Sequence, residues 1–297
     1  MSINPHPTLP EFDYIRPASL AEACAFLAGE PEARPFLGGT DVFVRMRDGF
    51  LVPRFLVDVK GLEGMQALRF DPKKGLTLGA AVDMNRVIAS KEVQAHYPLL
   101  AEACRSVASY QLRTRATIVG NICNASPAGD TIGACLLLDA ELQVHSPKGE
   151  RREALAQFFL GPGKTTLKPG DIVSAIHFPI PPRGGAGRYL KLGRNRLSDL
   201  SIVGVTAFGH PLADLPSGYR FRLALASVAP VPLLVPQVEE LLGKGPVTTE
   251  TLQEAGRLAS EACAPIDDVR GSARYRAQMV RNLSVKALTE VWEALSK

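Results

Sequence analysis

The sequence predicts an α+β fold in two parts. In the N-terminal part, an extended run, a glycine turn, a helical segment and a compact strand follow one another, which is typical of a βαβ unit with a parallel sheet. Residues 179–187 (PIPPRGGAG) concentrate proline and glycine and form the best linker in the chain. Beyond this linker, strands come first and helices last, which favours helices packed on one face of an antiparallel sheet.

Capping and turn residues place the elements of the βαβ unit. Ser19 precedes an apolar series with helical spacing that Gly29 ends, so we expect a helix between these two residues. An extended run at 34–37 leads into a glycine turn, and a short helix is expected at 42–47. The β-branched segment 55–59 then predicts a strand.

Turn signals and helical patterns organise the rest of the chain. Two hairpins are expected, one at 67–78 around Asp71-Pro72 and one at 142–155 around Pro147-Lys148-Gly149. The other expected helices are 91–108 (interrupted at Pro98), 130–138, 236–242, 249–263 and 272–295. The other expected strands are 172–178, 189–192, 201–208 and 220–227.

Composition excludes several classes of protein. Of 297 residues, 46% are apolar and 22% charged, as in an ordinary globular protein, and the net charge of +4 is spread along the chain. No basic stretch with interleaved aromatics indicates a nucleic-acid surface, and no apolar run could span a membrane. The N-terminus lacks the pattern of a signal peptide. Five cysteines without a CxxC pair favour reduced thiols in a cytoplasmic protein, with no metal site of its own.

The polar groups that could carry chemistry gather in two glycine-bearing segments, 34–42 (RPFLGGTDV) and 117–130 (TIVGNICNASPAGD). The five histidines are scattered, and no nucleophile constellation is visible. Because glycine has no Cβ, backbone N–H groups in such segments can approach an anion closely. Two such loops can grip one diphosphate from opposite sides. The pair therefore predicts a dinucleotide cofactor that supplies the chemistry while the protein positions it.

The two segments differ in how specific they are. Gly38-Gly39-Thr40 alone is more often a simple turn, and it does not fit the G-x-G-x-x-G fingerprint of a Rossmann domain. The second segment offers the close backbone approach of Gly120-Asn121, the polar groups of Asn124 and Ser126, and Asp130 as an acceptor for ribose hydroxyls. Asp130 could also serve only as the N-cap of the following helix, and the two roles are compatible.

These segments resemble the FAD-binding medium subunit of molybdenum hydroxylases, the family of the flavin subunits of carbon monoxide dehydrogenase and xanthine dehydrogenase. The similarity begins at FDYIRP (12–17) and covers nearly the whole chain. Further matching blocks are FFLGPGKTTL (158–167), YLKLGRNR (189–196) with Asp199, and SVAP (227–230). The chain departs from many relatives at Val119, where they carry a second glycine. It also lacks the cysteine-bearing insertion of 4-hydroxybenzoyl-CoA reductase, which argues against that enzyme.

The resemblance implies a fold and a cofactor site. The fold is a two-lobed FAD-binding domain of the vanillyl-alcohol-oxidase (PCMH) type over residues 1–178, followed by an α+β C-terminal domain over 187–297. FAD would lie extended between them. The implied contacts are the first diphosphate loop (Phe36, Leu37, Gly38, Gly39, Thr40, Asp41, Val42), the second (Thr117, Gly120, Asn121, Asn124), Asp130, Val107 and Ala108 near the flavin, Leu167 and Ile172 on the adenine side, and Lys191.

The resemblance also implies electron transfer inside a larger oxidoreductase. A large subunit with the molybdenum cofactor would oxidise substrate, and a small subunit with two two-iron two-sulfur clusters would pass electrons to FAD and then to an acceptor such as NAD. The expected assembly is a dimer of heterotrimers, a heterohexamer. The alternatives are a stand-alone FAD-dependent reductase on the same architecture and a non-catalytic nucleotide-binding protein.

Overall fold

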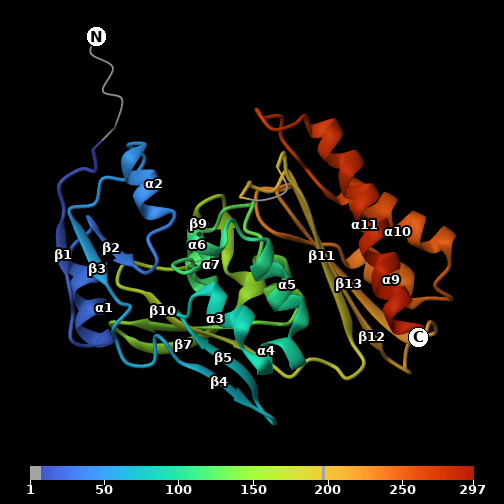
Figure 1. The fold of residues 1–297 in the computed structure, drawn as a ribbon, viewed down its shortest axis with the longest axis horizontal. Helices are drawn as coiled ribbons and strands as arrows, with labels where there is room; N and C mark the ends of the chain where they lie inside the picture. The colour runs from blue at the N-terminus through green and yellow to red at the C-terminus, as the bar shows by residue number, and fades with distance from the viewer. Residues whose placement is uncertain (1–7, 196–197) are drawn as a thin grey trace.

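The computed structural model describes residues 8–195 and 198–297 (Figure 1). Three larger sheets organise these residues, two in the N-terminal part and one in the C-terminal part. Figure 1 shows the C-terminal sheet and its helices on one side of the molecule, with the helices of the second lobe between that sheet and the first lobe. The predicted α+β class is confirmed.

The first lobe contains the predicted parallel sheet. Its strands are β1 (Asp13–Ile15), β2 (Ala33–Phe36) and β3 (Phe55–Asp58), in the order β1-β3-β2, and both pairings are parallel. The helix α1 (Leu20–Gly29) begins where Ser19 accepts a hydrogen bond from the Glu22 N–H, as the sequence predicts. The helix α2 (Val42–Arg47) has the predicted bounds. The strand β1 was not predicted, because its three residues are too few to show an alternating pattern of apolar and polar side chains.

The second lobe is built on an antiparallel sheet. Its order is β4 (Leu68–Asp71), β5 (Gly75–Gly79), β10 (Ile172–Phe178), β6 (Glu141–Ser146) and β7 (Gly149–Ala154), so both predicted hairpins are confirmed. A small hairpin, β8 (Phe159–Gly161) with β9 (Lys164–Thr165), follows the turn η1 (Leu155–Gln157).

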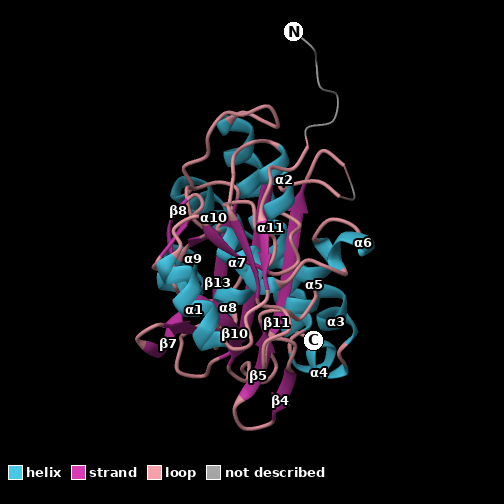
Figure 2. Ribbon diagram, turned by 90° about the vertical axis from the view of Figure 1, so that its left-hand side faces the viewer, coloured by secondary structure: helices cyan, strands magenta, loops and turns pink. Residues whose placement is uncertain are grey.

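Six short helices accompany this sheet. They are α3 (Met84–Ala89), α4 (Lys91–His96), α5 (Pro98–Ser106), α6 (Tyr110–Arg113), α7 (Ile118–Asn124) and α8 (Ile132–Leu137). The predicted helix at 91–108 is interrupted at Pro98, as expected, since proline is favoured at the first turn of a helix but not inside one. Figure 2 shows α3, α4, α5 and α6 together along one side of the molecule.

The C-terminal part is an antiparallel sheet with helices on one face. The strands β11 (Ala186–Leu192), β12 (Val203–Pro211), β13 (Tyr219–Ala226) and β14 (Leu233–Leu234) are neighbours in chain order. The helices are α9 (Pro236–Gly243), α10 (Thr249–Ala262) and α11 (Ala273–Leu295). The strand β11 begins inside the predicted linker, three residues earlier than expected. No helix of the described residues is long and apolar enough to cross a membrane.

The helix α8 joins the two parts of the molecule. Every one of its residues is buried, because it lies between the second lobe and the strands β12 and β13. Gly133 permits this approach, since a Cβ there would lie 2.2 Å from Thr206 Oγ1. Leu99 and Leu137 pack with Tyr189 in the same interface. The C-terminal sheet is thus packed directly behind the segment that carries Asp130.

Candidate functional site

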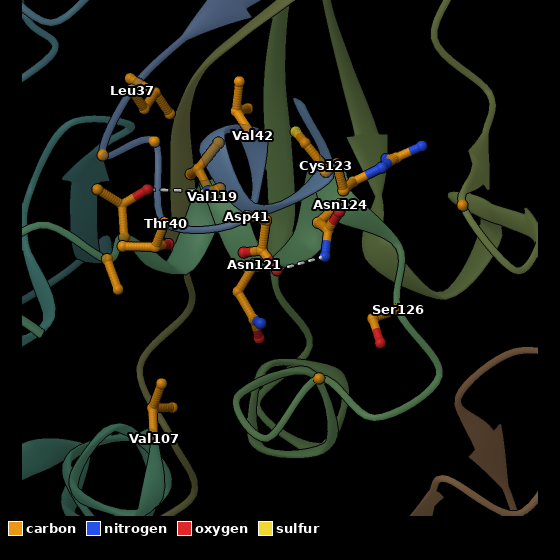
Figure 3. Close-up of a pocket in the computed structure, with 18 of the residues that line it drawn as sticks. Leu37, Thr40, Asp41, Val42, Val107, Val119, Asn121, Cys123, Asn124 and Ser126 are labelled. Carbon is orange, nitrogen blue, oxygen red and sulfur yellow. Dashed lines mark hydrogen bonds between the residues drawn. The ribbon is translucent and has the colours of Figure 1, made fainter. Parts of the chain in front are cut away.

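A cavity of about 740 Å³ opens between the two lobes and the start of the C-terminal part. Its wall is formed by the loop before α2, by α7 and the segment after it, by the region around Ile172, and by residues 198–200. Figure 3 shows Thr40 and Asp41 of the first segment beside Val119, Asn121 and Asn124 of the second. The size suits an organic cofactor.

Most of the residues expected at the site lie on this wall. They are Leu37, Gly38, Gly39, Thr40, Asp41, Val42, Val107, Ala108, Thr117, Gly120, Asn121, Asn124, Asp130, Leu167 and Ile172. Phe36 and Lys191 do not line the cavity, and both lie behind its wall. The wall also contains further residues of the two glycine-bearing segments, among them Ser126, which was expected to offer a polar group: Arg34, Pro35, Val119, Cys123, Ser126, Ala128 and Gly129. Other wall residues were not assigned to the site from the sequence: Arg45, Phe50, Leu51, Val59, Leu112, Ala116, Gly163, Asp171, Val173, Ser198, Asp199 and Leu200.

The first glycine segment is a true loop, and its glycines are needed for packing. A Cβ on Gly38 would lie 1.9 Å from the Arg115 carbonyl oxygen, so the loop can touch the second lobe only without a side chain. Gly39 has φ +76°, and a Cβ there would lie 2.6 Å from the Phe36 ring. The absent side chain of Gly39 therefore faces the ring behind the loop. The Phe36 ring occupies the position that a side chain at Gly39 would take, so glycine is required there by the packing of the protein alone.

The same loop leaves backbone donors free at the cavity. The N–H groups of Gly38, Gly39 and Thr40 have no backbone acceptor among the described residues. All three residues lie on the cavity wall, and Gly39 is buried. Successive free N–H groups at a glycine turn form a concavity that suits an anion. The loop thus fits the diphosphate of a dinucleotide.

The second glycine segment differs from the expectation, because residues 118–124 form the helix α7 and not a loop. The Thr117 hydroxyl caps this helix by accepting the Gly120 N–H at 2.9 Å. Ile118, Val119 and Ile122 are buried at helical spacing, and this burial outweighs the low helix propensity of Gly120. The backbone N–H of Gly120 is therefore already satisfied by Thr117.

Hydrogen bonds between distant residues fix the second segment in place. The Asn124 side-chain amide donates to Asp41 Oδ1 at 3.1 Å, which joins the two glycine segments across the cavity (Figure 3). The Thr131 hydroxyl donates to Asn121 Oδ1 at 2.8 Å. The first bond joins the two segments, and the second fixes Asn121 against the start of α8.

Asp130 is held by the C-terminal sheet and is not a helix cap. Thr131 occupies the N-cap position of α8 and makes no capping bond with its side chain. Asp130 Oδ1 accepts from the Tyr189 hydroxyl at 2.6 Å, and Oδ2 accepts from Lys191 Nζ at 2.7 Å. Lys191 Nζ also donates to the Ser106 carbonyl at 3.2 Å. Burial raises the pKa of Asp130, and the Lys191 ammonium and the Tyr189 hydroxyl only partly offset it.

The described residues offer no alternative chemistry at the wall. Among them, no group of three or more His, Cys, Asp or Glu side chains could hold a metal ion. Cys123 lies on the wall, but desolvation raises the pKa of its thiol to about 12, so the nucleophilic thiolate is disfavoured. The wall instead combines free N–H groups, side-chain amides and apolar surface.

Comparisons with known proteins agree with this geometry. Residues 10–181 match the family described as "FAD binding domain in molybdopterin dehydrogenase", and residues 188–291 match "CO dehydrogenase flavoprotein C-terminal domain". The chain is 31% identical over 278 residues to the xanthine dehydrogenase FAD-binding subunit of Escherichia coli O157:H7, covering 93% of this chain and 94% of that one. It is 31% identical to the carbon monoxide dehydrogenase medium chain of Hydrogenophaga pseudoflava, covering 95% and 98% of the two chains.

A solved structure has the same fold. The carbon monoxide dehydrogenase of Hydrogenophaga pseudoflava that lacks the Mo-pyranopterin moiety superimposes with a TM-score of 0.92 at 30% identity, covering 97% of this chain and 99% of that chain. The fold and the two-part site define a flavoprotein of the molybdenum hydroxylase class. The chain belongs to the family of FAD-binding medium subunits of the xanthine and carbon monoxide dehydrogenases.

Proposed function

We propose that this chain binds one FAD, without a covalent bond, and transfers electrons between a partner subunit and an external acceptor such as NAD. The observation that carries the proposal is the loop at Gly38–Thr40, whose residues line a cavity of about 740 Å³ and whose N–H groups have no backbone acceptor among the described residues. FAD supplies redox chemistry when it is bound. The protein contributes anion binding at the glycine loop, and apolar surface from residues such as Leu167 and Ile172 that excludes water.

The proposal assigns roles to the residues expected from the sequence. The wall residues from Leu37 to Val42 and from Thr117 to Asn124 bind the diphosphate and orient FAD, while Val107 and Ala108 lie beside the flavin. Asp130 contacts the cofactor with the lone pairs that Tyr189 and Lys191 leave free. Phe36 and Lys191 act from behind the wall. Residues 1–178 form the FAD-binding domain, and residues 187–297 form the C-terminal domain.

Membership of the family supports the proposed assembly. A large molybdenum-cofactor subunit and a small iron–sulfur subunit with two two-iron two-sulfur clusters complete the enzyme, as a dimer of heterotrimers in the cytoplasm. All five cysteines are free, and among the described residues no group of three or more His, Cys, Asp or Glu side chains could hold a metal ion. Electrons must therefore reach FAD from another subunit.

Cofactor content tests the proposal directly. We expect purified protein to carry one flavin per chain and to release it into the supernatant after acid precipitation, because no thiolate or histidine tether is placed on the wall. Flavin that stays in the pellet would contradict non-covalent binding. A chain that binds no FAD at all would favour the alternative of a different nucleotide ligand.

Electron transfer requires a second experiment. The purified flavoprotein is mixed anaerobically with candidate aromatic and heteroaromatic substrates, with and without the co-expressed partner subunits. We expect the flavin absorbance to bleach only when the partners are present. Bleaching by the lone chain would exclude the relay and favour the stand-alone reductase.

A further inference from the structure

A cluster of four side chains lies directly behind the glycine loop. It comprises Tyr14, Phe36, Asp58 and Lys60, and we call it the Lys60 brace. The three strands of the first lobe are parallel, so β1, β2 and β3 end at one edge of the sheet, where these residues gather. The glycine loop leaves the sheet at that same edge, immediately after Phe36.

Asp58 fixes the Lys60 ammonium. Asp58 Oδ1 accepts from the Lys60 backbone N–H at 3.0 Å and from Lys60 Nζ at 2.7 Å, and Asp58 Oδ2 accepts from the Tyr14 hydroxyl at 2.5 Å. The Lys60 side chain is 24% exposed and that of Asp58 13%. Lys60 is therefore held in one position, which is unusual for a lysine, whose four-carbon chain is normally mobile.

The ammonium of Lys60 is held against an aromatic ring. Lys60 Nζ lies 4.0 Å from the centroid of the Phe36 ring, within the range of a cation–π contact. The rings of Tyr14 and Phe43 also pack on Phe36, with centroid separations of 6.0 and 5.4 Å. The Phe36 ring thus has a fixed place and orientation.

The Phe36 ring in turn supports the loop. The position of a Cβ on Gly39 would be 2.6 Å from Phe36 Cε2, so the ring lies in close contact with the backbone that presents the free N–H groups. The Phe36 carbonyl also accepts from the Val59 N–H at 3.3 Å, next to Lys60. A change in the ring position would therefore move Gly39, and the ammonium that holds the ring is itself held by the Asp58 carboxylate.

We propose that Lys60 is a positioning residue for the anion site at Gly38–Thr40. It acts through Phe36, by holding the ring that supports Gly39. The ligand class is a diphosphate. The identification of that diphosphate as part of FAD rests on the proposed function, whereas the anion site rests on the geometry of the loop.

Three variants test the proposal. Lys60→Met removes the charge and keeps most of the side-chain length, and Lys60→Arg keeps a cation for the ring. Lys244→Met is the matched control, because Lys244 also pairs with a carboxylate but lies exposed at the C-terminal end of α9. Each apoprotein is titrated with FAD and with ADP, and its thermal unfolding is recorded. We expect Lys60→Met to weaken both ligands about fivefold, Lys60→Arg to restore the affinity, and Lys244→Met to change neither.

The outcomes separate the two proposals. If Lys60→Met binds both ligands with unchanged affinity, the role of the Lys60 brace is overturned while the proposed function stands. The same conclusion follows if Lys60→Met loses affinity and Lys60→Arg does not restore it. Wild-type protein that binds ADP but not FAD overturns the proposed function and leaves the brace testable with ADP. Binding of neither ligand overturns both. If Lys60→Met does not fold, Tyr14→Phe removes one of the bonds that hold Asp58, and a smaller loss of affinity for both ligands is expected.

Discussion

Two aspartates, Asp130 on the cavity wall and Asp58 behind the glycine loop, are each held by a tyrosine and a lysine, but they differ in burial. Asp58 binds Tyr14 and Lys60 at 2.5 and 2.7 Å, and Asp130 binds Tyr189 and Lys191 at 2.6 and 2.7 Å. The first trio lies within one lobe at the edge of its sheet, whereas the second joins the FAD-binding part to the C-terminal sheet.

Burial makes the two trios different. Tyr14 is 42% exposed, whereas Tyr189 is 6% exposed and part of the interface core. Desolvation would raise the pKa of Asp58, but the hydrogen bonds from Lys60 and Tyr14 outweigh it and hold that pKa below its usual value. For Asp130, desolvation prevails and its pKa is raised. Similar partners at similar distances therefore shift the two aspartate pKa values in opposite directions, because the cost of removing a carboxylate from water rises with its burial.

The largest expected difference is in the response to loss of the carboxylate. Asp130→Ala leaves the Lys191 ammonium and the Tyr189 hydroxyl without their partner in a buried interface, and we expect a loss of about 3 kcal/mol in the free energy of unfolding. This is the low end for a broken buried pair, because Lys191 keeps the Ser106 carbonyl. Asp58→Ala should cost about 1 kcal/mol or less, since its partners can reach water.

Urea unfolding of the two apoproteins at neutral pH measures this difference. An equal or larger loss for Asp58→Ala would show that the interface trio does not join the two parts. FAD affinity is a separate measurement, and Asp130→Ala should also weaken FAD binding by about 1–3 kcal/mol, the usual loss for a hydrogen bond to a charged group.

A smaller difference is expected for the two tyrosines. Tyr189→Phe leaves Asp130 Oδ1 without its donor in a buried site, which should lower the free energy of unfolding by about 1–2 kcal/mol. Tyr14→Phe removes a bond near the surface and should change it by about 0.5 kcal/mol or less. Thermal unfolding of both variants, each against wild type, measures the gap. Equal shifts in the two unfolding midpoints would mean that burial does not change how much each tyrosine contributes to stability.

The two trios also show what the sequence could and could not predict. Local signals were sufficient for α1, α2 and both hairpins, because a cap or a turn residue determines each of them. The residues of the cavity wall were likewise predictable where they form contiguous motifs. The partners of Asp130 lie 59 and 61 residues further along the chain, so their contact depends on how two sheets pack.

The helix α7 shows where local reasoning gave the wrong answer. Gly120 and Asn121 disfavour a helix by propensity, so the segment was expected to be a loop. Thr117 as a capping residue and the helical spacing of Ile118 and Ile122 are local signals for the helix, and the burial of that face outweighs the glycine. The role of Gly38 was also hidden, because the Arg115 carbonyl that it approaches belongs to the other lobe.

The smallest expected effect is an opposite pH dependence of the two aspartates. Because the folded pKa of Asp58 lies below its ordinary value of 3.8, its contribution to stability is complete above that value and is lost as the pH falls through the folded pKa. Because the folded pKa of Asp130 lies above 3.8, the pH-dependent part of its contribution is complete below 3.8 and is lost as the pH rises through the folded pKa. The hydrogen bonds from Tyr189 and Lys191 still contribute at neutral pH.

The variants Asp58→Asn and Asp130→Asn isolate these two contributions, since each keeps the side-chain shape and removes the titration. Unfolding by urea is compared with wild type between neutral pH and about pH 2, a range that extends below the ordinary pKa of an aspartate. As the pH falls, the stability gap between wild type and Asp58→Asn should narrow, and wild type should gain relative to Asp130→Asn. If the two stability differences between wild type and variant change in the same direction as the pH falls, burial is not the dominant factor at Asp130. The trio at the domain interface would then be electrostatically equivalent to the trio behind the glycine loop.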